Sequence, residues 1–253
     1  MNLLLLDEDD LGADGLARVR GRRARHVAGV LRAAPGDRIS VGRLGGRVGS
    51  AEVLAVSDDE VVLRPALDAD PPPPSPVSLL LALPRPKILR KVLQAVASMG
   101  VRRVVLVGSW RVEKSYFASP LLAPAAVAAE LRLGLEQGKD TVAPEVLVRR
   151  HFKPFVEDEL DAFFPPGASH RLLAHPVAPA PLAASAAALP GAVVAIGPEG
   201  GFTPYEAGTL ERLGFAPFSM GPRPLRVDVA VPFAVAQAEQ WLAAGGGVTP
   251  ASR

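Results

Sequence analysis

The chain has 253 residues, of which 49% are hydrophobic and 21% charged, and its formal net charge at pH 7 is +2. This length allows one large domain or two ordinary ones, and the apolar fraction is sufficient for a real core. The chain contains no cysteine and only four dispersed histidines, which disfavours a disulfide framework and a metal centre. Residues 3–6 are apolar but are followed by four acidic residues, so we expect neither a signal peptide nor a membrane span, and a cytoplasmic protein.

Basic side chains are concentrated near the N-terminus. The arginine fork suits phosphate, and such a cluster is typical of a nucleic-acid-binding surface, although a solvated basic face is the alternative. Because aromatic residues make up only 5% of the chain, we expect contacts with RNA phosphates and shape rather than a stacking platform. The cluster consists of Arg18, Arg20, Arg22, Arg23, Arg25, His26 and Arg32.

The first third of the chain predicts a small β-barrel with one helix. Residues 22–33 have Val27, Val30 and Leu31 at helical spacing, and short β-like runs follow at 38–41, 47–56 and 60–63, separated by glycines and by a Ser-Asp-Asp turn. Closure into a barrel leaves no long edge exposed. The proline run at 71–76 marks a domain boundary. We therefore expect an RNA-binding domain at 1–70, a linker at 71–76, a second domain at 77–245 and a flexible tail at 246–253.

Beyond the linker, strands alternate with helices. This alternation predicts an α/β fold with a mostly parallel sheet and helices on both faces. The expected strands are 77–83, 104–107, 146–148, 171–174, 192–196 and 215–220, and the expected helices are 87–99, 121–135, 178–188, 204–213 and 229–243.

Residues 192–206, AVVAIGPEGGFTPYE, predict a strand, a glycine loop and a helix. Thr203 is the expected N-cap, Pro204 the first helical residue and Glu206 the partner in a capping box. Such loops offer backbone N–H groups to a ligand. Glu199 would repel a phosphate, so we expect a neutral or cationic ligand with an adenosine-like face. A tight strand-to-helix connection without a ligand is the alternative.

A second loop, residues 220–228, reads MGPRPLRVD and also lies between an apolar run and a helical pattern. The two loops follow consecutive predicted strands. We expect these strands to be neighbours in the sheet, because the loops at the carboxyl ends of adjacent parallel strands share one crevice.

Together, IGPEGGF and GPRPLR resemble the RsmE family of the SPOUT superfamily, whose members methylate N3 of a uridine in small-subunit ribosomal RNA with S-adenosylmethionine. The resemblance extends to HVAGVLRAAPGD at 26–37, to Glu136-Gln137 with Pro144-Glu145, and to His175-Pro176, and so covers most of the chain. It implies a trefoil-knotted C-terminal sheet, an N-terminal PUA-like barrel, a homodimer and 16S ribosomal RNA as substrate.

The resemblance also assigns roles to residues. Arg226 would stabilise the uridine anion and Asp228 would accept the N3 proton. The implied cofactor-binding residues are Leu173, Ala174, His175, Pro176, Ile196, Gly197, Pro198, Glu199, Gly200, Gly201, Met220, Gly221, Arg223, Leu225 and Arg226. The candidate RNA-binding residues, taken from the basic cluster and from the segments similar to the family, are Arg22, Arg23, Arg25, His26, Arg32, Lys87, Lys91, Arg111 and Lys114.

Several assignments have alternatives. Residues 225–230 read LRVDVA where the family reads LRxETA, and Asp228 also suits the N-cap of the last helix, with Pro232 in its first turn. Arg226 also suits an RNA phosphate, Glu199 suits loop amides, and Ile196 suits the core. At the level of function, the alternatives are a SPOUT methyltransferase with another target, such as a ribose 2′-hydroxyl, and a non-catalytic RNA-binding assembly factor. The intact glycine loops argue against the latter.

Overall fold

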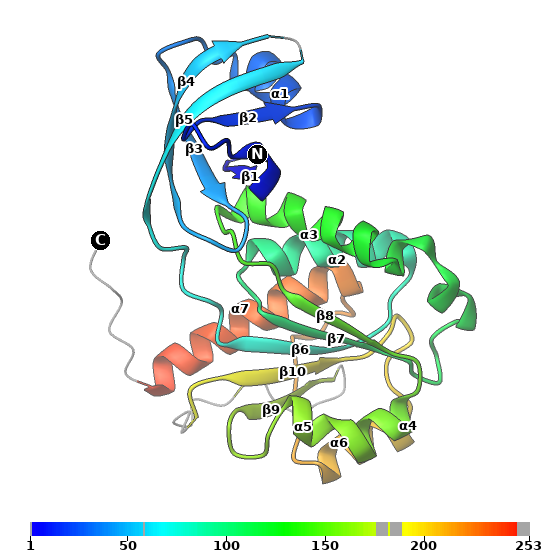
Figure 1. Ribbon diagram of the computed structural model, residues 1–253. Coiled ribbons are helices and arrows are strands. Elements are labelled where there is room, and N and C mark those ends of the chain that lie inside the picture. The colour runs from blue at the N-terminus through cyan, green and yellow to red at the C-terminus, as the bar shows by residue number, and fades with distance from the viewer. Residues whose placement is uncertain (1, 58, 176–181, 183–188, 247–253) are drawn as a thin grey trace.

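The computed structural model describes residues 2–57, 59–175, 182 and 189–246 (Figure 1). The larger sheet has six strands in the order β11-β9-β10-β6-β7-β8, and every pairing in it is parallel. This confirms the predicted α/β class with a parallel sheet. The strands are β6 (Val77–Ala82), β7 (Arg103–Val107), β8 (Glu145–Arg149), β9 (His170–Ala174), β10 (Ala192–Ile196) and β11 (Ala216–Phe218).

The expectation that the two motif strands are neighbours is wrong. Strand β9 lies between β10 and β11 and pairs with both, because the chain crosses β9 after leaving β10 and then forms the edge strand β11. The two loops therefore share the carboxyl edge of the sheet with a third loop, which follows β9.

Helices cover both faces of this sheet (Figure 1). The helices α2, α3 and α7 lie on the face toward the N-terminal region, and α4, α5 and α6 lie on the other. Their apolar positions recur at helical spacing; α2, for example, buries Leu89, Val92, Leu93 and Val96. Of the expected helices, 178–188 falls outside the described residues except for residue 182. The bounds are α2 (Pro86–Ser98), α3 (Pro124–Gly138), α4 (Phe152–Pro154), α5 (Leu160–Phe163), α6 (Pro204–Arg212) and α7 (Val227–Gly246), with short 3₁₀ turns at Lys114–Ala118 and Pro120–Leu122 and a π-helical turn at Phe155–Glu159.

The N-terminal region forms a second sheet of five strands in the order β1-β3-β4-β5-β2. The expected helix is α1 (Arg22–His26) continued by a π-helical turn, Val27–Leu31. Because π-helical bonding changes the angle between successive side chains, Val30 and Leu31 do not share the buried face of Val27 and are 67% and 43% exposed. The strands are β1 (Leu4–Leu6), β2 (Ala17–Arg20), β3 (Arg38–Arg43), β4 (Val48–Val56) and β5 (Glu60–Ala69), with a 3₁₀ turn at Glu8–Asp10.

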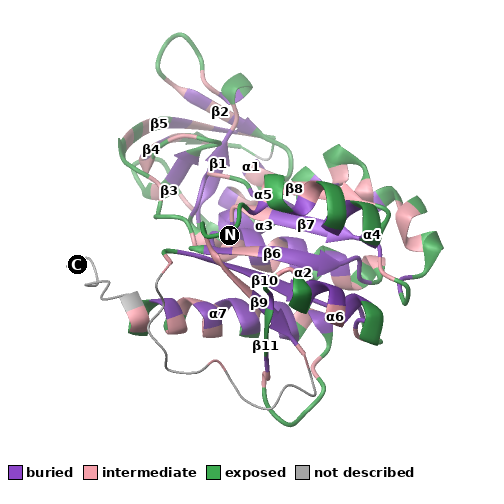
Figure 2. Ribbon diagram, turned by 90° about the horizontal axis from the view of Figure 1, so that it is seen from below, coloured by how far each residue is buried: buried purple, intermediate pink, exposed green. Residues whose placement is uncertain are grey.

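Strand β1, which the sequence pattern did not predict, joins the two hydrophobic cores. Leu3 and Leu5 belong to the core built on the six-stranded sheet, whereas Leu4 and Leu6 belong to the N-terminal core. Side chains alternate between the two faces of a strand, so a strand with a core on each face is apolar at every position. In Figure 2, β1 has the colour of buried residues, as do β6, β7 and β10 in the middle of the larger sheet.

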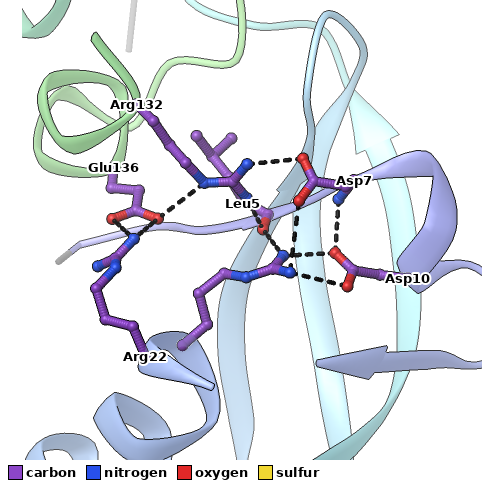
Figure 3. Close-up of polar contacts among 7 residues, drawn as sticks. Leu5, Asp7, Asp10, Arg22, Arg132 and Glu136 are labelled. Carbon is purple, nitrogen blue, oxygen red and sulfur yellow. Dashed lines mark hydrogen bonds and ion pairs between the residues drawn. The ribbon is translucent and has the colours of Figure 1, made fainter. Parts of the chain in front are cut away.

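Polar contacts also connect the two regions (Figure 3). The Arg22 guanidinium donates to both carboxylate oxygens of Glu136 at 2.8 and 2.9 Å, and the side chain of Glu136 is only 2% exposed. Arg132, one turn earlier on α3, donates to Asp7 and to the carbonyl of Leu5, each at 2.7 Å. Glu136, part of the family-like pattern, thus bonds the N-terminal region to α3.

Among the helices within the described residues, none has both the length and the apolar composition that a bilayer crossing requires.

Candidate active site

Three loops begin in one row at the carboxyl edge of the large sheet. In the registers of β9 with its two neighbours, Ala174 pairs with both Ile196 and Phe218, so the three strands end level. The amide of His175 donates to the carbonyl of Phe218 at 3.0 Å and fastens the loop after β9 to that after β11. The loop after β10 starts on the other side of β9. The sheet thus gathers the motif loops at the edge where α/β folds bind ligands.

The loop after β10 folds tightly on itself. A Cβ on Gly197 would lie 2.7 Å from the backbone nitrogen of Phe202, which only glycine avoids. The amide of Gly201 donates to the carbonyl of Pro198 at 2.7 Å, and its φ of 71° is in the left-handed region. Gly221, in the loop after β11, has a φ of 109°. At Gly201 and Gly221 no atom lies within 4 Å of the place of a Cβ, so both loops present bare backbone to open space, as a nucleoside-like cofactor requires.

Helix α6 begins at the predicted residue with the predicted capping box. Glu206 donates its amide to the Thr203 hydroxyl at 3.2 Å, and its carboxylate accepts from the Thr203 amide at 2.8 Å. The same carboxylate accepts from the amide of Trp110 at 2.8 Å. Glu206, 4% exposed, therefore fixes the loop after β7 as well as its own helix.

Glu199 turns toward the loop before α2. Its carboxylate accepts from the amide of Arg85 at 3.2 Å, and the Arg85 Nε lies 3.8 Å away. This contact favours the loop-amide interpretation of Glu199. Gly200, in the glycine loop, accepts at its carbonyl from the guanidinium of Arg111, which lies in the loop after β7, and the place of a Cβ on Gly200 is 3.1 Å from the Arg111 Cδ. Arg111 therefore contacts the glycine loop and stabilises its position.

The two candidate catalytic residues contact each other. Arg226 donates from Nε and from a terminal nitrogen to Asp228 at 3.1 and 2.6 Å. Lys91 of α2 donates to the same carboxylate at 3.1 Å. The side chain of Asp228 is 8% exposed, while that of Arg226 is 68% exposed and that of Lys91 61%. One carboxylate thus holds two exposed cations beside the loop after β11.

The hydrogen bonds from Arg226, assisted by Lys91 and opposed by desolvation, lower the pKa of Asp228 to about 2. The same contact raises the pKa of Arg226. A carboxylate with so low a pKa is a weak proton acceptor near neutral pH. The arrangement therefore suits orientation of the Arg226 cation better than proton abstraction by Asp228.

The N-cap interpretation of Asp228 is wrong. Helix α7 begins at Val227, one residue before it, and the Asp228 carboxylate contacts Arg226 and Lys91. Pro232 likewise falls inside the helix and not in its first turn. The helix starts earlier because the Arg226 carbonyl accepts from the amides of Val229 and Ala230 at 2.9 and 2.7 Å.

The remaining cofactor-binding candidates fall into three groups. Leu173, Ala174 and Ile196 are buried in the core, and Gly197 and Pro198 are buried at the start of their loop. Met220 and Leu225 are half-buried and Arg223 is exposed. Pro176 lies outside the described residues.

The RNA-binding candidates differ in their solvent exposure and in whether other residues of the chain already contact them. Arg23 is only 16% exposed and donates to Asp10 and to the Leu5 carbonyl, so we assign it to the stability of the N-terminal region. Burial lowers the pKa of His26, whose Nε2 is buried without a partner among the described residues. Arg25, Arg32, Lys87 and Lys114 are exposed, and Arg22, Lys91 and Arg111 make the contacts given above.

Sequence reasoning missed residues whose role depends on distant partners. Arg85, which meets Glu199, carries no local signal, and neither does Ser109, whose hydroxyl lies 3.3 Å from Glu206. The described residues contain no group of three or more His, Asp or Glu side chains placed to hold a metal ion.

Comparisons with known proteins agree with this geometry. A family model described as an RNA methyltransferase domain matches residues 71–239. Ribosomal RNA small subunit methyltransferase E of Treponema pallidum is 30% identical over 235 residues, which covers 91% of this chain and 87% of that protein.

Two solved structures share the fold. A Legionella pneumophila protein with bound S-adenosylmethionine matches with a TM-score of 0.71 at 22% identity, covering 95% of this chain and 97% of that one. Ribosomal RNA small subunit methyltransferase E from Neisseria gonorrhoeae, also bound to S-adenosylmethionine, gives a TM-score of 0.70 at 20% identity with the same coverage. Since the family model covers more than half of the chain and the Treponema relative nearly all of it, the chain belongs to the RsmE family of RNA methyltransferases.

Proposed function

We propose that this protein transfers a methyl group from S-adenosylmethionine to N3 of a uridine in 16S ribosomal RNA. Its family makes it an S-adenosylmethionine-dependent ribosomal RNA methyltransferase. The observation that carries the proposal is the meeting of three loops at Ala174, Ile196 and Phe218, with Arg226 beside them. We also propose that the protein acts in the cytoplasm, where it would meet small-subunit ribosomal RNA.

In this proposal S-adenosylmethionine supplies the methyl group, and the chain supplies position and charge. The residues that fit the cofactor are the backbone of Gly197–Gly201, that of Met220–Leu225, and the loop after Ala174. Arg226 stabilises the negative charge that remains when N3 of uridine loses its proton, and Asp228 orients Arg226. Lys91 adds a second positive charge at the same point. We do not assign the proton acceptor to Asp228, because its pKa is about 2.

We further propose a homodimer. Val229 and Phe233, one turn apart on α7 and next to Asp228, are 47% and 43% exposed. Two large apolar side chains exposed at a functional edge support contact with a second copy of the chain. A dimer would complete the site around Arg226.

The finer architecture is also a proposal. Residues 1–70 would be a PUA-like barrel that grips RNA, residues 71–76 the linker and residues 77–245 the methyltransferase domain. The five-stranded N-terminal sheet with α1 supports the barrel. The insertion of β10 between β6 and β9 supports a trefoil knot.

The decisive experiment maps methylated nucleosides by mass spectrometry. Small-subunit RNA from cells lacking the gene is incubated with the protein and S-adenosylmethionine, and digested. We expect one new N3-methyluridine, and an inactive Arg226→Ala variant as control. A mark on a ribose 2′-hydroxyl would support the alternative target, and no methylation together with no cofactor affinity by calorimetry would support a non-catalytic RNA-binding factor.

A further inference from the structure

A second cavity opens at the carboxyl edge of the large sheet, beyond β7 and β8. Its volume is about 980 Å³. Gly108 and Arg150, the residues after these two strands, line it, as do Thr203 and Tyr205 at the start of α6. Thr203 ends the glycine loop after β10, so this cavity adjoins the proposed cofactor site without including any of its assigned residues.

Aromatic side chains gather at this cavity although they are scarce in the chain. Trp110 is 87% exposed and Tyr205 is 57% exposed, and Phe117 and Phe152 also line the cavity. The Arg150 guanidinium lies 5.7 Å from the centre of the Phe117 ring. An indole that is almost fully exposed at the mouth of a cavity offers a flat apolar surface for another ring.

The charge of the cavity is positive. Lys114, Arg150 and Lys153 line it, and neither Lys114 nor Arg150 forms an ion pair within the part of the chain that the structure describes. Among the described residues, the ion-pair partner of Lys153 is Glu157, at 3.9 Å. Glu206 is the one carboxylate among the lining residues, and it is buried and already accepts from Thr203, Ser109 and Trp110.

Aromatic faces next to unpaired cations are the combination that binds single-stranded RNA, because bases stack on the rings and phosphates meet the cations. Among the described residues that line the cavity, none selects for an acidic segment or for a large apolar side chain of another protein. A nucleotide chain carries both flat bases and negatively charged phosphates, so it uses the aromatic residues and the cations at once. The low aromatic content of the chain favours contacts with phosphates and shape, but at this cavity aromatic residues from distant segments lie together.

We propose that this cavity binds an unpaired nucleotide of the RNA substrate that neighbours the methylated uridine. The base stacks on Trp110, and the backbone phosphates contact Arg150 and Lys114. The inference rests on the proposed function and adds a second point at which RNA is held on the same edge of the sheet.

The first test reads stacking directly and needs no turnover. The chain has two tryptophans, so a Trp241→Phe variant leaves Trp110 as the only indole. Its fluorescence is titrated with a single-stranded oligoribonucleotide of about ten nucleotides that contains the target uridine, and with an abasic ribose-phosphate chain of equal length. We expect saturable quenching by the RNA and none by the abasic chain. Equal signals from the two would overturn the stacking.

The second test is kinetic. Trp110→Leu should raise the KM for naked small-subunit RNA about tenfold or more, with kcat and the affinity for S-adenosylmethionine unchanged, and Trp110→Phe should restore most of the loss. Leu133→Ala is the control, because Leu133 is an exposed position on α3, and this variant should behave as wild type. An unchanged KM in Trp110→Leu would overturn the proposal while methylation itself continued.

Assembled small subunits separate RNA from a protein occupant. An effect of Trp110→Leu confined to assembled subunits would mean that a ribosomal protein enters the cavity, and would overturn the proposal. If the protein methylated no RNA and bound no S-adenosylmethionine, the proposed function would fail. The fluorescence titration would then still decide the cavity by itself, because quenching by RNA alone supports it.

Discussion

Arg226 donates two hydrogen bonds to the carboxylate of Asp228, two residues further along the chain. The bond from Nε is 3.1 Å long, and the bond from a terminal guanidinium nitrogen is 2.6 Å long. The carboxylate is nearly buried and the guanidinium is largely exposed. Asp228 therefore holds the Arg226 guanidinium in position at the start of α7, while most of the Arg226 side chain remains exposed to solvent.

Arg226→Ala should lower turnover far more than affinity for S-adenosylmethionine. The substitution removes the charge that stabilises the uridine anion and touches the cofactor loops only at their end, so we expect a fall in kcat of about a hundredfold or more. Calorimetry should give a cofactor Kd within about threefold of wild type. Arg226→Lys should recover part of the rate, and an unaltered kcat would remove Arg226 from the catalytic machinery.

Asp228→Asn should lower kcat about ten- to hundredfold, because the guanidinium loses its charged acceptor. A matched control is Asp14→Asn. Asp14 is an exposed carboxylate whose pKa is likewise lowered to about 2, chiefly by a hydrogen bond from an arginine, Arg18, but it lies in the N-terminal region. Equal rates for the two variants would contradict the positioning role.

The pH dependence follows from the same pair. A carboxyl group with a lowered folded pKa stabilises the fold above its ordinary value of 3.8 and loses that contribution as the pH falls through about 2. Asp228 therefore stays ionised across the neutral range, and the profiles of kcat for wild type and Asp228→Asn should have the same shape between about pH 6 and 9. An inflection present only in the wild type would instead identify Asp228 as the base.

Gly197→Ala should weaken cofactor binding about tenfold or more, because its methyl group would collide with the Phe202 backbone nitrogen and displace the loop. Gly208→Ala is the control. The place of its methyl group is in ordinary contact with Arg212, and alanine suits a helix better than glycine, so affinity should not change. Calorimetry with S-adenosylmethionine measures both, and tight binding by Gly197→Ala would show that this loop does not shape the site.

Glu136→Gln should reduce the free energy of unfolding by about 1–3 kcal/mol, because a nearly buried carboxylate that accepts from Arg22 and forms an ion pair with Arg132 loses its charge. Glu52→Gln removes an exposed partner of Arg64 and should cost about 0.5 kcal/mol or less. Urea unfolding gives both values. Similar small losses in the two variants would mean that β1 and the apolar contacts alone join the two regions.

How much the sequence predicted depends on the range of each signal. The capping box of Thr203 and Glu206 lies within four residues, and the apolar spacing of α2 lies within one helix, so both were predicted with their boundaries nearly correct. The strand β1 was missed because its partner β3 lies far along the chain and because an all-apolar tetrapeptide has no periodicity. Its role as the link between the two hydrophobic cores becomes visible only in the folded structure.

The candidate site shows the same division. The two glycine motifs indicated the loops that we propose to bind the cofactor, yet the position of β9 between their strands depends on sheet order, which no local pattern encodes. Asp228 was interpreted as an N-cap because its neighbours in sequence favour one, whereas Lys91 reaches it from a helix much earlier in the chain. Trp110, Arg150 and Tyr205 meet at one cavity from three separate segments, so composition alone argued against a stacking surface.

The place of β10 in the sheet has a consequence for how the protein matures. Strand β10 pairs with β6, the first strand of the large sheet to be synthesised, and with β9, which directly precedes β10 in the chain. The backbone groups of β6 on the side of β10 therefore have no strand partner until most of the polypeptide has been synthesised. No hairpin can seed this arrangement, and ordering so long a stretch before any contact repays it slows folding. We therefore expect sluggish renaturation from denaturant and a prolonged need for chaperones during translation.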